Sequence, residues 1–250
     1  MLSQGIPLSD AGPQTPLIVP AGNPELFSKI MNSPVVYIRE DPKCCLCPET
    51  YKVYIYSAVI TDQQYDVLKD LVFSVVDDAC SVCCESCSHL NFYGPSGTDL
   101  QFFVAFPGCL EDCCKDCCKC GGCCQCNCVQ YGQPLRGYYG NTRDNFFGWY
   151  AKRFCGLCSP FQYCNSDTYE FFGKMQDSRL LLKVNCWESF NPCINCYPLH
   201  FHLFKGQQDY GVITRSPRGC CGTFTYEIQF PPGLTLEERL LLIAFCCKRT

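Results

Sequence analysis

The sequence predicts a mainly β fold, in which a closed antiparallel barrel surrounds a buried hydrophobic helix near the C-terminal end. Two observations lead to this prediction. From about residue 50, short runs rich in Val, Ile, Phe, Tyr and Thr are separated by Gly, Pro, Asn, Asp or Cys, which is typical of successive strands. After the last run, the pattern changes to that of a single helix that is apolar on nearly every side. A barrel closed around that helix satisfies both observations.

Nine runs are expected to be strands. They span residues 51–60, 65–76, 100–106, 146–154, 168–175, 180–185, 199–205, 210–214 and 223–230. The clearest is 199–205, LHFHLFK, in which apolar residues occupy every second position, the period of a half-buried strand. Many antiparallel strands at this spacing favour a sandwich or a barrel.

The helix is expected over residues 234–247. Pro231 and Pro232 end the preceding strand, and Thr235 followed three residues later by Glu238 has the pattern of a capping box. After Arg239 the residues are apolar around the whole circumference, so the helix should be buried on every side. Fourteen residues extend only about 21 Å at 1.5 Å per residue, which is too short to cross a bilayer.

Residues 1–48 differ in composition from the rest. They contain eight prolines among Gly, Ser, Asn and Gln, a pattern that favours an extended segment without a helix or a central strand. We therefore expect a Pro-rich N-terminal arm over 1–48 and a barrel domain over 49–250, with the arm either solvated or docked on a protein partner.

Charge and motifs exclude several functions. The net charge is −4 and Lys or Arg never occur in runs longer than two, so nucleic acid is not expected as a partner. The sequence has no Gly-rich phosphate loop, no His-Glu-x-x-His helix and no Gly-x-Ser-x-Gly elbow. Bond-making catalysis is therefore not expected.

Twenty-seven cysteines are the strongest compositional signal. The first residues, MLSQGIPLSD, lack the charged and apolar stretches of a signal peptide. The expected compartment is then the reducing cytosol, where thiols act as metal ligands, acylation sites or small core residues.

The densest cysteine segment extends from Cys109 to Cys128 and has few apolar neighbours. We expect S-palmitoylation there, because two or more acyl chains give durable membrane anchoring that one chain cannot. The alternatives are a metal site at Cys-x-x-Cys pairs, or thiols that are only packed or cross-linked. The palmitoylation candidates are Cys113, Cys114, Cys117, Cys118, Cys120, Cys123 and Cys124.

A second set combines Cys193 and Cys196 with His200 and His202 on the strand that follows. Thiolates and imidazoles together suit zinc, so these four residues are a candidate zinc site. The alternative is that both histidines are solvent-facing strand residues.

Several segments resemble the phospholipid scramblase family. Residues 225–247, TYEIQFPPGLTLEERLLLIAFCC, are similar to its final strand and hydrophobic C-terminal helix. Residues 64–77 and 179–218 are similar to earlier and later strands, and the Cys-rich segment occupies the place of the family's acylated cysteines. The resemblance implies a tubby-like barrel of about twelve strands, lipid anchoring at the cytoplasmic face of a membrane, the plasma membrane being the expected one, and calcium-dependent movement of phospholipids between leaflets.

The sequence departs from the family where calcium is expected to bind. The segment before the final strand, residues 218–223, is RGCCGT and holds no carboxylate, whereas calcium requires several oxygen ligands. A calcium site is therefore not supported. Two hypotheses follow: a scramblase-family membrane protein acting on phospholipids, or a non-enzymatic structural or binding module that docks in a larger assembly through its Pro-rich arm.

Overall fold

The computed structural model describes residues 22–41, 49–56, 69–78, 89–105, 134–153, 166–174, 179–185, 198–218 and 223–248. They form two helices and twelve strands, and the expected mainly β class is confirmed. The helices are α1 (Pro24–Asn32) and α4 (Leu236–Lys248). The strands are β1 (Val35–Glu40), β2 (Glu49–Tyr56), β3 (Lys69–Asp78), β4 (His89–Tyr93), β5 (Leu100–Ala105), β6 (Leu135–Tyr139), β7 (Phe146–Arg153), β8 (Ser166–Gly173), β9 (Arg179–Asn185), β10 (Leu199–Lys205), β11 (Gln208–Arg218) and β12 (Thr223–Gln229).

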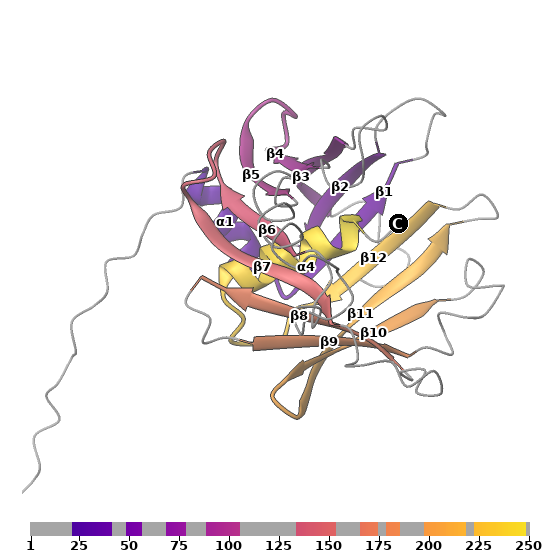
Figure 1. The fold of residues 1–250 in the computed structure, drawn as a ribbon. Helices are drawn as coiled ribbons and strands as arrows, with labels where there is room; N and C mark the ends of the chain where they lie inside the picture. The colour runs from indigo at the N-terminus through magenta and orange to yellow at the C-terminus, as the bar shows by residue number, and fades with distance from the viewer. Residues whose placement is uncertain are drawn as a thin grey trace, which may run out of the picture.

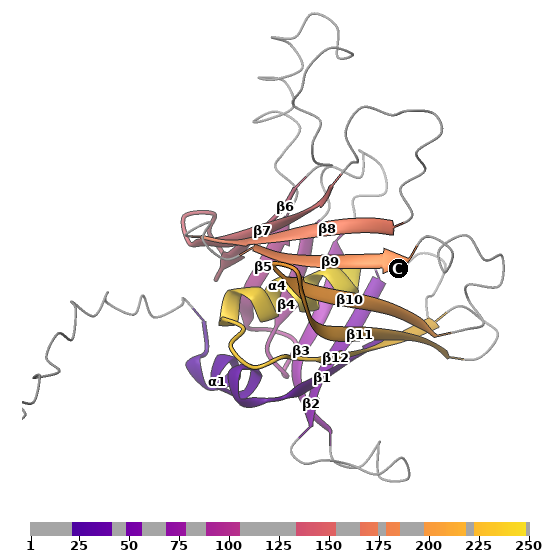
Figure 2. The same ribbon diagram turned by 90° about the horizontal axis from the view of Figure 1, so that it is seen from below.

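The strands form a closed antiparallel ring around α4 (Figures 1 and 2). Each strand pairs with its neighbours in the chain, and β1 closes the ring by pairing with both β2 and β12. In β1, Val36 lies opposite Ile55 on one side and Ile228 on the other. All three side chains are buried and face the interior, because alternate residues of a strand point to opposite faces of the sheet.

Helix α4 fills the barrel interior. Its capping box is formed as the sequence predicts: the Glu238 N–H donates to Thr235 Oγ1 (3.2 Å), and the Thr235 N–H donates to Glu238 Oε2 (2.8 Å). Thr235 is thus the residue before the first turn, and the helix begins two residues later than expected. Residues 238–247 are all buried. Of the helices in the described ranges, neither has the length and apolar character required to cross a bilayer.

The expectation of an extended arm without helix or central strand over 1–48 is wrong for residues 24–40. Asn23 caps α1 by accepting a hydrogen bond from the Glu25 N–H (2.9 Å), with Pro24 in the first turn, a position that proline tolerates. Leu26, Phe27 and Ile30 form its buried face. Strand β1 is a full member of the ring, so the boundary at residue 48 separates two paired strands. Proline content concealed both elements, although no proline lies inside β1 and the only proline of α1, Pro24, is in its first turn. Residues 1–21 fall outside the described ranges.

Two short strands, β4 and β6, were also missed. Each has five residues and borders a cysteine-rich segment, so neither offers a run long enough for periodicity to be recognised. In β6, Gly137 lies opposite Gly148 of β7. A Cβ atom at Gly148 would be 2.5 Å from the Phe172 carbonyl oxygen and 3.1 Å from the Leu241 side chain. Glycine is required here because the sheet and α4 approach closely.

Candidate functional site on the outer face of the barrel

Strands β5 to β7 carry a second hydrophobic cluster, separate from the barrel core. It consists of Phe103, Ala105 and Tyr138, with Leu100 and Phe146 packed against them, and we call it the outer aromatic cluster. The rings of Phe103 and Tyr138 are stacked with centroids 5.1 Å apart, and Tyr138 meets Phe146 edge-on at 5.8 Å. These side chains alternate along the strands with core residues, so their outward direction follows from the strand period.

Aromatic side chains continue around the barrel onto β8. Trp149 of β7 lies opposite Phe172 of β8, and their rings stack at 4.2 Å. On its other side, Trp149 lies opposite Arg136 of β6. The outer face of β5 to β8 therefore holds two groups of rings: the outer aromatic cluster, in which Phe103 and Tyr138 are buried, and the partly exposed pair of Trp149 and Phe172.

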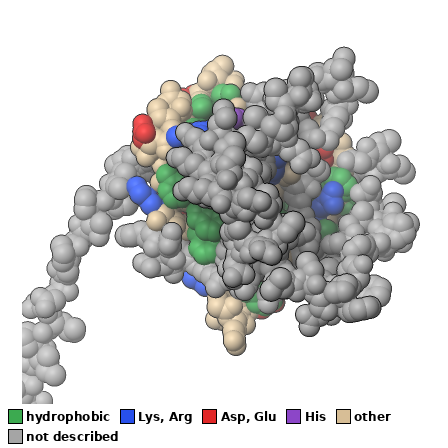
Figure 3. Space-filling model, in the orientation of Figure 1, with side chains coloured by type: hydrophobic (Ala, Val, Ile, Leu, Met, Phe, Trp, Pro, Cys, Tyr) green, Lys and Arg blue, Asp and Glu red, His purple; other side chains and the backbone are tan. Residues whose placement is uncertain are grey.

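A hollow of about 370 Å³ lies on this face. It is lined by Arg136, Tyr138, Arg143, Phe146, Trp149, Gly173 and Lys174, and we call it the cationic hollow. Its three cations come from β6, from the turn between β6 and β7, and from the residue after β8. In Figure 3, hydrophobic side chains in green are visible near the centre of this view, and basic side chains in blue lie at separate places around them.

The described lining of the hollow holds three basic side chains, of which Arg136 and Arg143 have interaction partners of their own. Among the described residues that line it there is no carboxylate; Asp144 follows Arg143 in the same turn but does not line it. Arginine binds phosphate and carboxylate oxygens through a planar fork of donors, and both Arg and Lys pair favourably with aromatic faces. The arrangement can hold an anionic group beside an aromatic surface.

The predicted acylation segment begins and ends beside this hollow. Ala105 is the last residue of β5, and it pairs with Arg136 of β6. The chain between these strands contains all seven palmitoylation candidates, Cys113, Cys114, Cys117, Cys118, Cys120, Cys123 and Cys124. These cysteines lie outside the described ranges, so their acylation stays a prediction, but both of the strand ends to which the segment is attached lie at the outer aromatic cluster.

The candidate zinc residues are placed only in part. Cys193 and Cys196 lie outside the described ranges. His200 and His202 are exposed on β10, where they alternate with buried residues as expected. His200 Nδ1 lies 3.3 Å from Thr214 Oγ1, and His202 Nδ1 lies 3.5 Å from Asp209 Oδ2. Within the described part of the chain, no three His, Cys, Asp or Glu side chains are grouped as a metal site, so the zinc site stays a prediction. The segment 218–223, where the resemblance places calcium binding, is described only at residues 218 and 223.

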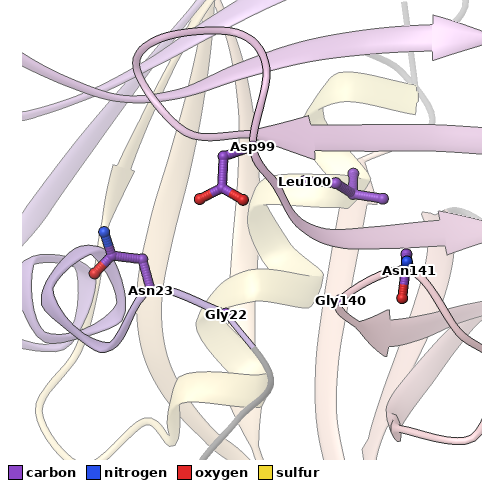
Figure 4. A pocket seen from close by; sticks show the side chains of 6 residues that line it. All are labelled: Gly22, Asn23, Asp99, Leu100, Gly140 and Asn141. Atoms are coloured by element: carbon purple, nitrogen blue, oxygen red, sulfur yellow. The ribbon is translucent and has the colours of Figure 1, made fainter.

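A second pocket, of about 470 Å³, lies where the chain enters α1 (Figure 4). Its lining residues are Gly22, Asn23, Asp99, Leu100, Gly140 and Asn141. Gln101 is fully buried and ties these segments together: its Oε1 accepts from the Asn23 N–H (2.6 Å), and its Nε2 donates to Asp99 Oδ2 (2.5 Å). With its amide committed to α1 and to the turn after β4, Gln101 has a structural role.

Buried polar groups inside the barrel join α4 to its surroundings. The Arg239 guanidinium donates to the carbonyl oxygens of Ile30 (2.9 Å) and Ser33 (2.7 Å) and lies over the Phe230 ring at 4.6 Å. Burial lowers the pKa of Arg239 from its usual range. At the other end of α4, Lys248 Nζ pairs with Asp77 Oδ2 at 2.7 Å. The charges at both ends of the helix therefore hold it in the ring.

Three further groups are made less acidic by burial. Burial raises the pKa of Tyr139, and the nearby Glu237 carboxylate, which accepts a hydrogen bond from the Tyr139 hydroxyl (3.3 Å), raises it further. Burial also raises the pKa values of Tyr150 and Cys247 well above their usual ranges, with smaller contributions from neighbouring acidic groups. A thiol held in its neutral form is a poor nucleophile, so Cys247 is a core residue.

Sequence reasoning missed the cationic hollow. The available signal was the segment 135–149, where Arg136 and Tyr138 follow a strand period before a turn rich in Gly and Asn. Phe146 and Trp149 after the turn are three residues apart, and only a register shift between β6 and β7 accommodates them. Comparison with known proteins adds no relative: no family model, no curated protein and no solved structure matches this chain.

Proposed function

We propose that the protein associates with the cytoplasmic face of a membrane and moves phospholipids between its leaflets, as a scramblase-like protein with a tubby-like barrel. The observation that carries this proposal is the position of the cationic hollow, with Phe146 and Trp149 partly exposed in its lining, on the strands that flank the predicted acylation segment. One side of the barrel thus combines three features suited to a lipid surface.

Each feature contributes in a different way. Aromatic rings with polar edges partition into the interface of a bilayer. Basic residues near the surface are attracted to anionic lipids of the cytoplasmic leaflet. Two or more acyl chains convert weak, reversible contact into stable anchoring. Together they orient β5 to β8 toward the lipid.

The proposal places lipid contact on the outside of the barrel. The apolar residues of α4 are already covered by the strands, so they have no surface left to offer to lipid. A phospholipid that moves along the protein would then have its headgroup in contact with polar groups of the outer face, where the cationic hollow lies.

Reconstitution of the full chain tests the function. Liposomes would contain a fluorescent phosphatidylcholine in both leaflets, and a membrane-impermeant reductant would bleach the outer one. We expect bleaching beyond one half when the protein is present, with protein-free liposomes as the control. Bleaching that stops at one half in liposomes shown to carry the protein would overturn the proposal.

Acylation is tested separately. Intact-protein mass spectrometry on material from the native source should show increments of one palmitoyl group per modified cysteine that disappear after hydroxylamine, which cleaves thioesters. Replacing the seven candidate cysteines with serine should remove these increments. An unmodified mass would contradict lipid anchoring.

A structural or binding module is the second candidate function. It is favoured by the absence of a carboxylate in residues 218–223, where calcium control would be expected, and by the pairing of β1 with both β2 and β12, which makes part of the Pro-rich segment a member of the barrel. Failure of lipid translocation together with stable capture of the chain in a larger assembly would support this alternative.

A further inference from the structure

The cysteines of the chain are all joined to one end of the barrel. Successive antiparallel strands are connected alternately at the two ends of the ring. The end at which β1 finishes at Glu40 and β2 begins at Glu49, which we call the thiol end, carries six of these connections. They are residues 41–48, 79–88, 106–134, 154–165, 186–198 and 219–222. All of the 27 cysteines except Cys246 and Cys247 belong to these six connections, and the connections at the opposite end contain none.

The C-terminal end of α4 lies at the thiol end as well. Lys248 Nζ pairs with Asp77 Oδ2 at 2.7 Å, and Asp77 is the residue before the last of β3. Cys246 and Cys247 are fully buried there, and burial raises the pKa of the Cys247 thiol. Metal ligands are thiolates, so these two covered cysteines belong to the core, and ligands are expected from the connections instead.

We infer that the thiol end binds one zinc ion through Cys44, Cys47, Cys80 and Cys83. These four residues lie outside the described ranges, but the strand ends to which they are joined are described. Cys44 and Cys47 form a Cys-x-x-Cys pair just before β2, and Cys80 and Cys83 form another just after β3. Two such pairs are the ligand pattern of structural zinc sites with four thiolates.

The pairing of β2 with β3 brings the two cysteine pairs within reach of each other. Glu49 at the start of β2 lies opposite Asp77. Cys47 is two residues before Glu49, and Cys80 is three residues after Asp77. Paired strands are about 5 Å apart, and a chain extends at most about 3.6 Å per residue. Both cysteines are therefore held close to one strand pair, and a shared ion would join the β1–β2 connection to the β3–β4 connection.

The interval between the cysteines favours zinc over acylation at these positions. Acylation requires no fixed interval between thiols, whereas a tetrahedral ion is bound by pairs that one tight turn presents together. Cys84 and Cys87 form a further pair, but they precede β4, which is one strand further from β2. The palmitoylation candidates all lie in the connection between β5 and β6, so the zinc site does not depend on the proposed function.

Metal analysis of the full chain tests the inference. The chain is loaded with zinc under reducing conditions, and bound zinc per chain is measured by inductively coupled plasma mass spectrometry. We expect C44S/C47S and C80S/C83S each to lose one equivalent of zinc. The variant with all four substitutions should lose the same single equivalent, because both pairs bind one ion. Loss of two equivalents in that variant, or no loss in either pair, would overturn the inference.

A matched control changes another Cys-x-x-Cys pair. C155S/C158S makes the same substitutions in the connection after β7, a strand that pairs with neither β2 nor β3. Adding C44S/C47S to this control should still remove one equivalent of zinc. If the control alone already removes that equivalent, so that C44S/C47S removes nothing more, the assigned ligands are wrong.

Thiol alkylation of the unmodified sequence tests the site without any variant that has to fold. Peptide mapping should show the four cysteines protected from alkylation in the zinc-loaded chain and labelled after the zinc is removed with a chelator. Equal labelling in both states would contradict the site. A disulfide, or a hydroxylamine-sensitive acyl group, on these four cysteines in material from the native source would also overturn it.

Discussion

The inner and outer faces of the barrel use aromatic side chains in different ways. Inside, the Phe245 ring of α4 meets Tyr150, Phe171 and Phe201 edge-on, with centroids 5.9, 5.8 and 5.9 Å apart, and every ring is covered by protein. Outside, Trp149 stacks on Phe172 and lines a hollow shared with three cations. The comparison teaches that neighbouring residues of one strand can supply a covered ring to the core and a partly exposed ring to the outer face.

The largest expected effect contrasts one ring from each face. Phe245→Ala removes a fully covered side chain from α4 and should lower the free energy of unfolding by about 3–5 kcal/mol. Trp149→Ala should cost below about 1.5 kcal/mol, the loss of one aromatic pair, while weakening vesicle binding. Urea unfolding and vesicle flotation of both variants check the contrast. Similar losses of stability would show that the outer ring is part of the core.

A second contrast concerns inner and outer arginines. Arg239→Met removes two charge-assisted hydrogen bonds to the carbonyl oxygens of Ile30 and Ser33, so we expect a loss of about 3 kcal/mol. Arg143→Gln on the exposed turn should change stability by less than about 0.5 kcal/mol. Urea midpoints measure both. A small effect at Arg239 would contradict its role in joining α1 to α4.

The interior should also respond to alkali. Burial, with nearby Cys246 and Asp77, raises the pKa of the Cys247 thiol. A thiol in the unfolded chain ionises near pH 8.5, so between that pH and the raised folded-state pKa the folded state binds more protons. The contribution of the Cys247 thiol to the free energy of unfolding is fully present below about pH 8.5. Above that pH it falls by up to about 1.4 kcal/mol per pH unit.

Urea unfolding between pH 7.5 and 9.5 checks this dependence and stays below the range where unfolded tyrosines ionise. Cys247→Ala should flatten the slope whatever it does to the absolute stability. If the free energy of unfolding of this variant still falls with pH as steeply as that of the wild type, groups other than Cys247 cause the pH dependence.

The smallest effect is expected at the first turn of α4. Thr235→Ala removes the acceptor of the Glu238 N–H and should cost about 1 kcal/mol. Thr235→Ser, which keeps the hydroxyl, is the matched control. A thermal or urea scan that shows both variants equal to wild type would contradict a role for the capping box in fixing where the helix begins.

Much of the strand pattern could be predicted because it is local. Leu199, Phe201 and Leu203 alternate with exposed histidines, and β10 is found over the residues that this period indicates. The capping pattern of Thr235 and Glu238 likewise located the start of α4 to within two residues. By contrast, α1 and β1 were missed because the proline content of the segment outweighed the short amphipathic pattern of α1. The residue that binds the end of α1, Arg239, is about 200 residues away in the sequence.

The individual residues of the candidate site could be named from the sequence, but their common location could not. Arg136, Tyr138 and Trp149 can be read from the sequence, but their common hollow depends on the pairing of β6 with β7 and of β7 with β8. Lys174 joins them only because β8 ends next to that pairing. The cysteine and histidine sets could be named from spacing, whereas spacing does not determine which ligands meet in space.

The sequence by itself determined the mainly β class, the period of its clearest strands and the apolar, capped helix at the C-terminal end, because each depends on residues a few positions apart. The tertiary structure decided that the segment 24–40 belongs to the barrel and that three distant cations line one hollow together with Trp149. The physical reason is that strand pairing joins residues far apart in the chain, and its register is set by burial and hydrogen bonding across the whole ring.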